Sequence, residues 1–429
     1  MRNYNLSAVL LVLLVLRTHC AAAAQADLSQ PLSLTQAVQV AIDHNHDVRL
    51  GGLAVDSAGA AKLIAAASPN PMLTVQSFNI NPALGIGAGS LRAKTVDSAI
   101  RMDQLIERGG KRGLRIDTAV QLEDAARNDL RDSYRQLKIN VAQAYYDVLA
   151  AQEKRTITLE TAALYDHTVT AAQKRQKAGD IAAADVARLQ VDALRAQNDV
   201  VQTEADLNRA RQALALLLGK IASAGQLALT DGWPDDAFDI AVPTDSLTDQ
   251  RPDVLAAKFR LDAAGTAYKQ ALAMRTRDVS VGVQIDHYPA SPANPQGSGN
   301  SVGIALQIPL FTRNQFDGDI RSAALAVDMA QEMLAKIRDQ ARSELFGNWQ
   351  AADTAYRRLQ RYDSALLVMA KRAADAAEFA YVNGALGVMD VLDARRTYRA
   401  TRLDAVAARA DYAKSLATWR ATISESKTQ

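Results

Sequence analysis

The feature that most constrains the fold is a run of 65 residues, 114–178, which contains neither glycine nor proline. Glycine is entropically costly inside a helix and proline removes a hydrogen-bond donor, so their absence over this length predicts one continuous α-helix. That helix would be about 100 Å long, whereas the average helix of a globular protein has about 11–12 residues. Gly179 ends the run, and a second helix is predicted as far as Leu218, just before Gly219.

The second predicted helix carries a stripe of apolar and small residues spaced three and four apart. This spacing places them on one helix face and is typical of the seam between two helices in a coiled coil. We therefore expect the two long helices to pack as an antiparallel hairpin. The predicted seam consists of Val186, Leu189, Ala193, Ala196, Val200, Thr203, Leu207, Ala210, Leu214 and Leu217.

The chain also repeats itself at an offset of 205 or 206 residues. A constant offset over this much chain predicts two copies of one unit. We expect a first structural repeat at residues 27–230 and a second at residues 231–429, each with a helix, two strands and a long helical hairpin. The opening helices are expected at residues 34–67 and 247–274. The matched positions include Asp47 and Asp253, Val48 and Val254, Gly179 and Gly384, Asp185 and Asp390, and Val186 and Val391.

Each repeat contains two segments in which apolar residues alternate with small or polar ones. Alternation with a period of two places the apolar side chains on one face of a β-strand. Strands with one apolar face and one small or polar face are typical of barrels that span the outer membrane. The strands are expected at residues 72–80, 96–103, 279–286 and 302–308, with loops rich in Gly, Pro, Ser and Asn at 81–90 and 289–300.

Four such strands cannot close a barrel by themselves, because two unpaired edges would remain in the hydrocarbon. Membrane barrels have at least eight strands, so the missing strands must come from other copies of the chain. Three copies would supply twelve. The expected fold is mainly α with a membrane β part: long antiparallel helical hairpins that form a coiled-coil tunnel, and four strands contributed to a trimeric 12-stranded barrel. The alternative, a soluble α+β protein with two small hairpins, leaves the long helices without a partner.

Residues 1–26 are predicted to be a signal peptide, with Arg2 ahead of an apolar run at 8–16 and alanines at 21–24 and 26. The chain's one cysteine, Cys20, lies in this segment. The residues before Cys20 lack the leucine and small side chains that precede a lipidated cysteine, so simple cleavage is favoured over lipidation. The mature chain would then have no thiol or disulfide chemistry.

Charge and motifs exclude several function classes. The chain has 49 Lys and Arg against 47 Asp and Glu, and this balance argues against a nucleic-acid partner. His44 and His46 are two apart and would not face each other on a helix, so no metal site is expected. The sequence around Gly109, Gly110 and Lys111 lacks the frame of a phosphate-binding loop. We expect no enzyme activity and no cofactor.

Three motifs point to one family. Residues 381–394, YVNGALGVMDVLDA, and 177–186, KAGDIAAADV, have the form of two paired hairpin tips. Residues 104–112, QLIERGGKR, are similar to a strand-to-helix turn of the cobalt–zinc–cadmium (CzcC-like) branch of that family. Over essentially its whole mature length the chain resembles the TolC-like outer-membrane efflux proteins.

The resemblance implies an outer-membrane exit duct of a tripartite efflux system. A homotrimer in contact with outer-membrane lipid would passively conduct substrates, heavy-metal cations in the first place, from an inner-membrane pump of the RND type and a periplasmic adaptor to the exterior. The same fold would serve as an exit duct for drugs or for type I protein secretion. An alternative from another class is a secreted coiled-coil or adhesin-like structural protein, which would need no apolar strands.

Two carboxylates have an expected role that also follows from spacing. Asp390 and Asp393 are three apart on a predicted helix, so in a trimer they would form two stacked rings that favour cations. The resemblance places both, with Tyr381, at the channel constriction, although Asp390 could instead cap its helix. Some family members have an arginine where this chain has Leu386, so a salt bridge built on that arginine does not carry over. By resemblance the adaptor would dock at Gly179, Ile181, Asp185, Gly384 and Leu386.

Overall fold

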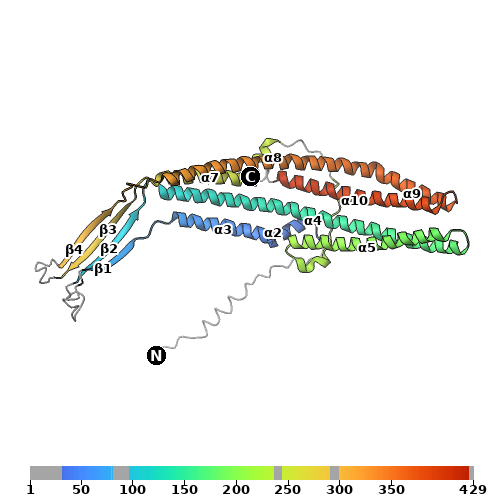
Figure 1. Cartoon of the computed structure of the whole chain (residues 1–429), viewed down its shortest axis with the longest axis horizontal. Helices are drawn as coiled ribbons and strands as arrows, with labels where there is room; N and C mark the ends of the chain where they lie inside the picture. The colour runs from blue at the N-terminus through green and yellow to red at the C-terminus, as the bar shows by residue number, and fades with distance from the viewer. Residues whose placement is uncertain (1–30, 79, 81–95, 236–243, 290–298, 425–429) are drawn as a thin grey trace, which may run out of the picture. The chain divides into compact units, whose positions relative to one another are not determined.

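The computed structural model describes residues 31–78, 80, 96–235, 244–289 and 299–424 (Figure 1). The predicted signal peptide and most of the two predicted inter-strand loops lie outside these residues. The chain divides into two compact units, each assembled from separated pieces. The first unit comprises residues 1–46, 137–240 and 350–420, and the second comprises residues 47–136, 241–349 and 421–429. Both units therefore draw on both halves of the sequence.

The second unit contains one four-stranded antiparallel sheet in the order β1-β2-β3-β4 (Figure 1). The strand pair of the first half of the sequence and that of the second half form one sheet, because β2 pairs with β3. In this pairing Ile100 lies opposite Ile285. The strands lie close to their predicted positions, and their bounds are β1 Met72–Phe78, β2 Asp97–Ile106, β3 Val279–Tyr288 and β4 Gly299–Gln307.

The two faces of this sheet differ as the alternation predicts. One face is polar or small in character. On this face Ala99 and Asp286 are buried, and Arg101 forms an ion pair with Asp103 at 2.7 Å. The apolar face is uncovered: nine of its side chains are 51–84% exposed. These nine are Leu73, Val75, Ile100, Met102, Val283, Ile285, Val302, Ile304 and Leu306.

The helices that open each predicted repeat are interrupted. The predicted helix at 34–67 is divided into α2 (Leu34–His44) and α3 (His46–Ala66), because Asn45 has an extended backbone. The predicted helix at 247–274 is divided into α6 (Asp245–Asp249) and α7 (Pro252–Ala273). Proline lacks the N–H that would continue a helix but suits its first turn, which explains the new start at Pro252.

The long helices are confirmed. Helix α4 (Lys111–Lys177) runs for 67 residues without a break and is followed by α5 (Ala183–Leu217) and a short 3₁₀ helix, η3 (Ile221–Gln226). In the other half, α8 (Asp317–Arg361) passes through a π-helical turn, η4 (Tyr362–Leu366), into α9 (Leu367–Val382), and α10 (Val388–Ser424) returns.

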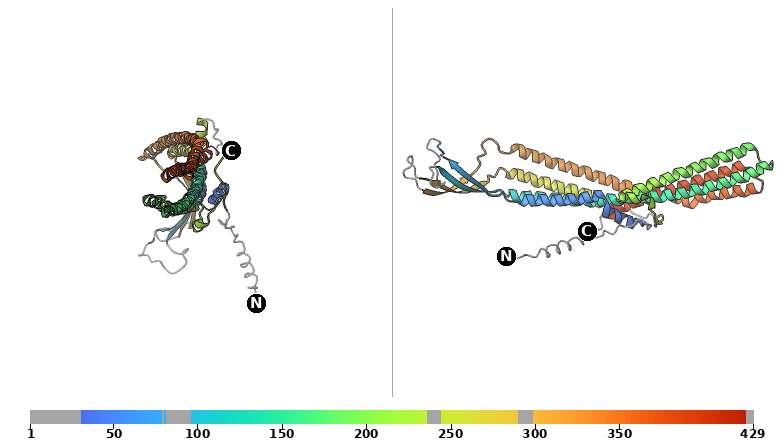
Figure 2. Two further views of the ribbon diagram at one scale, coloured as in Figure 1. Left: turned by 90° about the vertical axis from the view of Figure 1, so that its right-hand side faces the viewer. Right: turned by 90° about the horizontal axis from the view of Figure 1, so that it is seen from below.

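The first unit contains the distal part of two hairpins, α4–α5 and α9–α10 (Figure 2). The predicted seam of α5 faces a core: Val186, Leu189, Ala193, Ala196, Leu207 and Leu214 are buried, and the other four predicted residues are half-buried. Within the described ranges of the chain, no helix combines the length and the apolarity needed to span a membrane.

Candidate functional site

Both hairpins turn at a glycine in the left-handed backbone region, Gly179 with φ +86° and Gly384 with φ +75°. In each turn the N–H after the glycine donates to the carbonyl five residues earlier, at 2.9 and 2.8 Å. This is the Schellman arrangement that ends a helix. A Cβ atom at either glycine would meet nothing within 4 Å, so backbone conformation, and not space, demands glycine here. The predicted glycine caps are confirmed.

The remaining predicted tip residues differ in exposure. Leu386 is 39% exposed, but Ile181 is half-buried and packs on a core cluster that includes Leu189 and Leu392. Asp185 lies in the first turn of α5, and one of its oxygens is 3.8 Å from Nη1 of Arg188. Ile181 therefore supports the tip from inside, and a docking role for these residues stays a prediction.

The two predicted constriction carboxylates lie at the start of α10, and both are exposed. Asp390 accepts a hydrogen bond from the backbone N–H of Gly387 at 3.2 Å. It therefore caps the first turn of the helix, the alternative role that its position suggests. Asp393 has neither a hydrogen bond nor an ion pair with any residue that the structure describes. A ring of carboxylates would need further copies of the chain and stays a prediction.

Tyr381 joins the two hairpins near their tips. Its hydroxyl accepts a hydrogen bond of 2.7 Å from Nη1 of Arg175, whose Cζ lies 5.4 Å from the centre of the tyrosine ring. Arg175 belongs to α4 and Tyr381 to α9. Arg175 carries no sequence signal for this contact, because an arginine in the last turn of a helix is ordinarily explained by the helix dipole.

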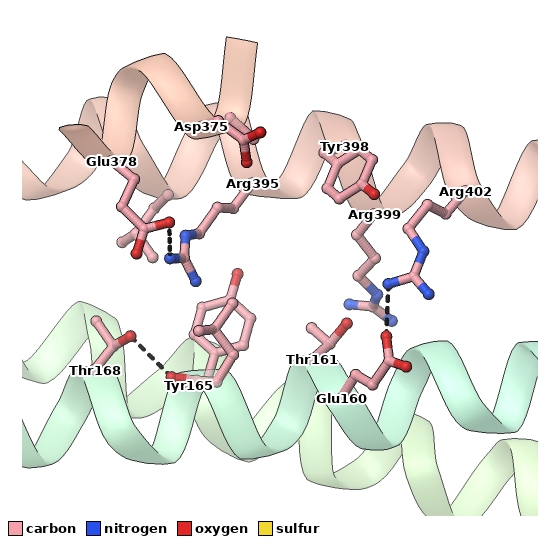
Figure 3. Close-up of a pocket in the computed structure, with 13 residues that line it drawn as sticks. Glu160, Thr161, Tyr165, Thr168, Asp375, Glu378, Arg395, Tyr398, Arg399 and Arg402 are labelled. Atoms are coloured by element: carbon pink, nitrogen blue, oxygen red, sulfur yellow. Dashed lines mark hydrogen bonds and ion pairs between the residues drawn. The ribbon is translucent and has the colours of Figure 1, made fainter. Parts of the chain in front are cut away.

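A pocket of about 290 Å³ lies between α4, α9 and α10 (Figure 3). Arg395 pairs with Glu378 at 2.6 Å within one hairpin, and Arg402 pairs with Glu160 at 2.7 Å across to the other hairpin. The lining has three arginines and three carboxylates, and Tyr165 lies between the helices (Figure 3). The pocket is thus electrically balanced, and its charges tie the hairpins together.

Two further ion pairs connect α10 to α5: Arg396 with Asp192, and Arg399 with Asp199. Burial lowers the pKa of Arg396, but the hydrogen bond and charge of Asp192 outweigh burial and raise that pKa. Asp192 is buried beside the seam residue Ala193. In the sequence, the position of Asp192 next to the seam residue Ala193 indicates that this carboxylate needs a basic partner. It does not indicate which arginine is that partner.

Among the residues that the structure describes, no three His, Cys, Asp or Glu side chains are grouped so that they could hold a metal ion. The ring nitrogen Nδ1 of His44 lies 3.0 Å from the carbonyl oxygen of Val40 in its own helix. What the tips present to solvent is a pair of helical turns with exposed carboxylates.

Comparisons with known proteins agree with this architecture. The cobalt-zinc-cadmium resistance protein CzcC of Cupriavidus metallidurans is 28% identical over 383 residues, which cover 87% of this chain and 85% of that protein. The cation efflux system protein CusC of Escherichia coli K12 is 27% identical over 276 residues, 61% of this chain and 58% of that protein. A crystal structure of a membrane protein from Pseudomonas aeruginosa superposes with a TM-score of 0.77 at 22% identity, covering 91% of this chain and 93% of that one.

The family comparison is decisive. The family model described as outer membrane efflux protein matches residues 37–220 and 244–423. These two segments contain both strand pairs, both hairpins and both glycine turns described above. The family resemblance inferred from the tip motifs is confirmed, and the chain belongs to the outer membrane efflux protein family.

Proposed function

We propose that this outer-membrane protein works as a homotrimer in which each copy contributes β1–β4 to one 12-stranded barrel. The observation that carries the proposal is the uncovered apolar face of the sheet. Nine large apolar side chains that are each more than half exposed would be unfavourable in water, at about 25 cal/mol for every Å² of apolar surface. Contact with hydrocarbon removes that cost, and outward-facing apolar bands are typical of membrane barrels.

The edges of the sheet supply the reason for more than one copy. Among the described residues, β1 pairs only with β2 and β4 pairs only with β3, so one edge of each outer strand is free. A free edge within a bilayer leaves backbone groups without partners. Pairing of β1 in one copy with β4 in the next satisfies both edges and requires an oligomer. The number of three copies, which gives twelve strands, follows from the resemblance to the TolC-like family.

The proposal includes the two structural repeats, residues 27–230 and 231–429. It is supported by the same element order in both halves and by the same Schellman turn at Gly179 and Gly384. The family model also matches in two segments of nearly equal length. In this proposal the paired hairpins of three copies form a periplasmic tunnel.

The proposed cargo is heavy-metal cations, which pass without a catalytic step. Relatives that carry cobalt-zinc-cadmium resistance and cation efflux in their names support this class. The exposed Asp390 and Asp393 of α10, together with Tyr381 of α9, would form the constriction, because rings of carboxylates favour cations. An adaptor and an inner-membrane RND-type pump would deliver the cargo to the tips around Gly179 and Gly384.

The trimer is tested by disulfide cross-linking of purified outer membranes. Cys20 is the chain's one cysteine, so a Cys20→Ser background allows Thr74→Cys in β1 to be combined with single cysteines along β4. Covalent trimers are expected only in double-cysteine variants, with each single-cysteine variant as the control. The mass of the detergent-extracted complex should equal three chains. A water-soluble monomer would end the barrel proposal.

The cargo is tested separately by deleting the gene in its own host. Loss of growth in cobalt, zinc or cadmium, restored by the intact gene, is the expected result. Sensitivity to organic drugs with unchanged metal tolerance would assign the duct to a drug pump. A secretion defect without either sensitivity would favour a protein cargo.

A further inference from the structure

A groove of about 490 Å³ lies in the second unit, where the sheet meets the helices. None of the hairpin-tip residues lines it. Three of its residues are arginines. The lining consists of Arg108, Arg275, Thr276, Arg277, Phe311 and Gln315.

The strand register places two of these arginines beside the ends of β2 and β3. The last pair between β2 and β3 is Ile106 opposite Val279. Arg108 and Arg277 each lie two residues beyond that pair, just outside β2 and β3. The backbone N–H of Arg108 donates to Oδ1 of Asp278 at 2.9 Å. This hydrogen bond keeps the segment after β2 beside the segment before β3. The exposed side chains of Arg108 and Arg277 therefore lie just beyond the end of the β2–β3 pair.

The carboxylates near the groove are already engaged. Asp278 pairs with Lys111 at 2.8 Å, and Asp317 pairs with Arg275 at 2.5 Å. The guanidinium of Arg277 lies over the Phe311 ring, 5.8 Å from its centre. Within the described part of the chain, the guanidinium groups of Arg108 and Arg277 have no hydrogen bond and no ion pair. The groove thus holds two guanidinium groups whose N–H donors are available to an anion, and the charge of Arg108 also acts on the Asp278 carboxylate.

We propose that this groove binds the phosphate of an anionic phospholipid headgroup at the periplasmic boundary of the membrane. Arginine presents forked donors that match phosphate oxygens, and its long stem lies along apolar surface while the charge reaches the headgroup layer. Beside the groove, Ile106 and Leu310 are 49% and 72% exposed, and the acyl chains would lie against them.

This inference rests on the proposed membrane-facing sheet and is tested on the full-length, detergent-purified assembly. Native mass spectrometry would follow binding of phosphatidylglycerol, with phosphatidylcholine and inorganic phosphate as separate probes. The variant Arg108→Gln/Arg277→Gln removes both guanidinium groups. The matched control is Arg361→Gln/Arg372→Gln, which removes the same charge from exposed positions on α8 and α9.

A basic side chain near a membrane surface strengthens anionic-lipid binding about fivefold, so the double variant should bind phosphatidylglycerol roughly thirtyfold more weakly. The control variant and the affinity for phosphatidylcholine should change less than about twofold. Arg277→Lys keeps the charge but loses the fork, and we expect an intermediate affinity.

Each contrary outcome has a distinct meaning. A double variant that assembles in the outer membrane and binds phosphatidylglycerol like the wild type would overturn the lipid site and leave the proposed function standing. Equal binding of both lipids by the wild type would also overturn it. Inorganic phosphate that displaces the lipid at equal concentration would make this a free-phosphate site. A wild-type chain that is a soluble monomer would instead overturn the proposed function.

Discussion

Introducing a charge on the apolar face of the sheet should prevent assembly in the membrane. Ile304 is 84% exposed and lies opposite Val283 in β3. It is the sixth of the nine residues of β4. At about 3.3 Å per residue it lies about 17 Å from one end of the strand and about 10 Å from the other. This position is well inside an apolar band about 25 Å tall.

We expect Ile304→Arg to cost about 2–4 kcal/mol per copy, the range for arginine on the lipid face near mid-membrane. In a homotrimer all three copies carry the change, so the assembly loses about three times that amount. The measurement is the amount of heat-dissociable oligomer in the outer-membrane fraction. It should fall to a small part of the wild-type level.

The matched control is Gly303→Arg, which adds the same charge one residue away on the opposite face. A side chain at Gly303 meets no atom within 4 Å of its Cβ, and its partner Gln284 belongs to the polar face, where it donates to Asp286 at 2.5 Å. Assembly should be largely retained. Ile304→Met, without a charge, should also be tolerated. Equal losses in the two arginine variants would refute the assignment of the faces.

Three further changes test other parts of the molecule. Gly384→Pro cannot adopt φ +75° and removes the N–H of the turn, so metal resistance should be lost while assembly is kept; normal resistance would place adaptor docking elsewhere. Asp390→Ala combined with Asp393→Ala should abolish cation preference in planar-bilayer conductance, and unchanged selectivity would remove both residues from the constriction. The hydrogen bond from Lys62 lowers the pKa of Glu123 in the folded protein. The ionised Glu123 therefore stabilises the fold at pH values above its unfolded pKa, and this stabilisation is lost as the pH falls through its lower folded pKa. Urea unfolding of Glu123→Gln should therefore show less acid sensitivity below about pH 4.5, and an identical pH profile would contradict the argument.

Features with a local cause were predictable from the sequence. The continuous helix α4 follows from the absence of glycine and proline, residue by residue. The alternation of the strands follows from their period of two, which assigns each side chain to a face before any partner is known. Gly179 and Gly384 were predictable as caps because a left-handed turn has a strong preference for glycine. The capping role of Asp390 was predictable as well, since capping depends only on the residues beside it.

Features that depend on distant partners were decided by the tertiary structure. The pairing of β2 with β3 places Ile100 opposite Ile285. The hydrogen bond between Arg175 and Tyr381 connects residues that are 206 positions apart in the sequence. A period in the sequence reports which face a side chain occupies, but it carries no information on which of many similar residues will lie opposite. Arginines recur along α10, and only helix packing selects Arg396 for Asp192. The sequence by itself thus determined the elements and their faces, while three-dimensional packing chose their partners, because partner choice is a property of two segments and periodicity is a property of one.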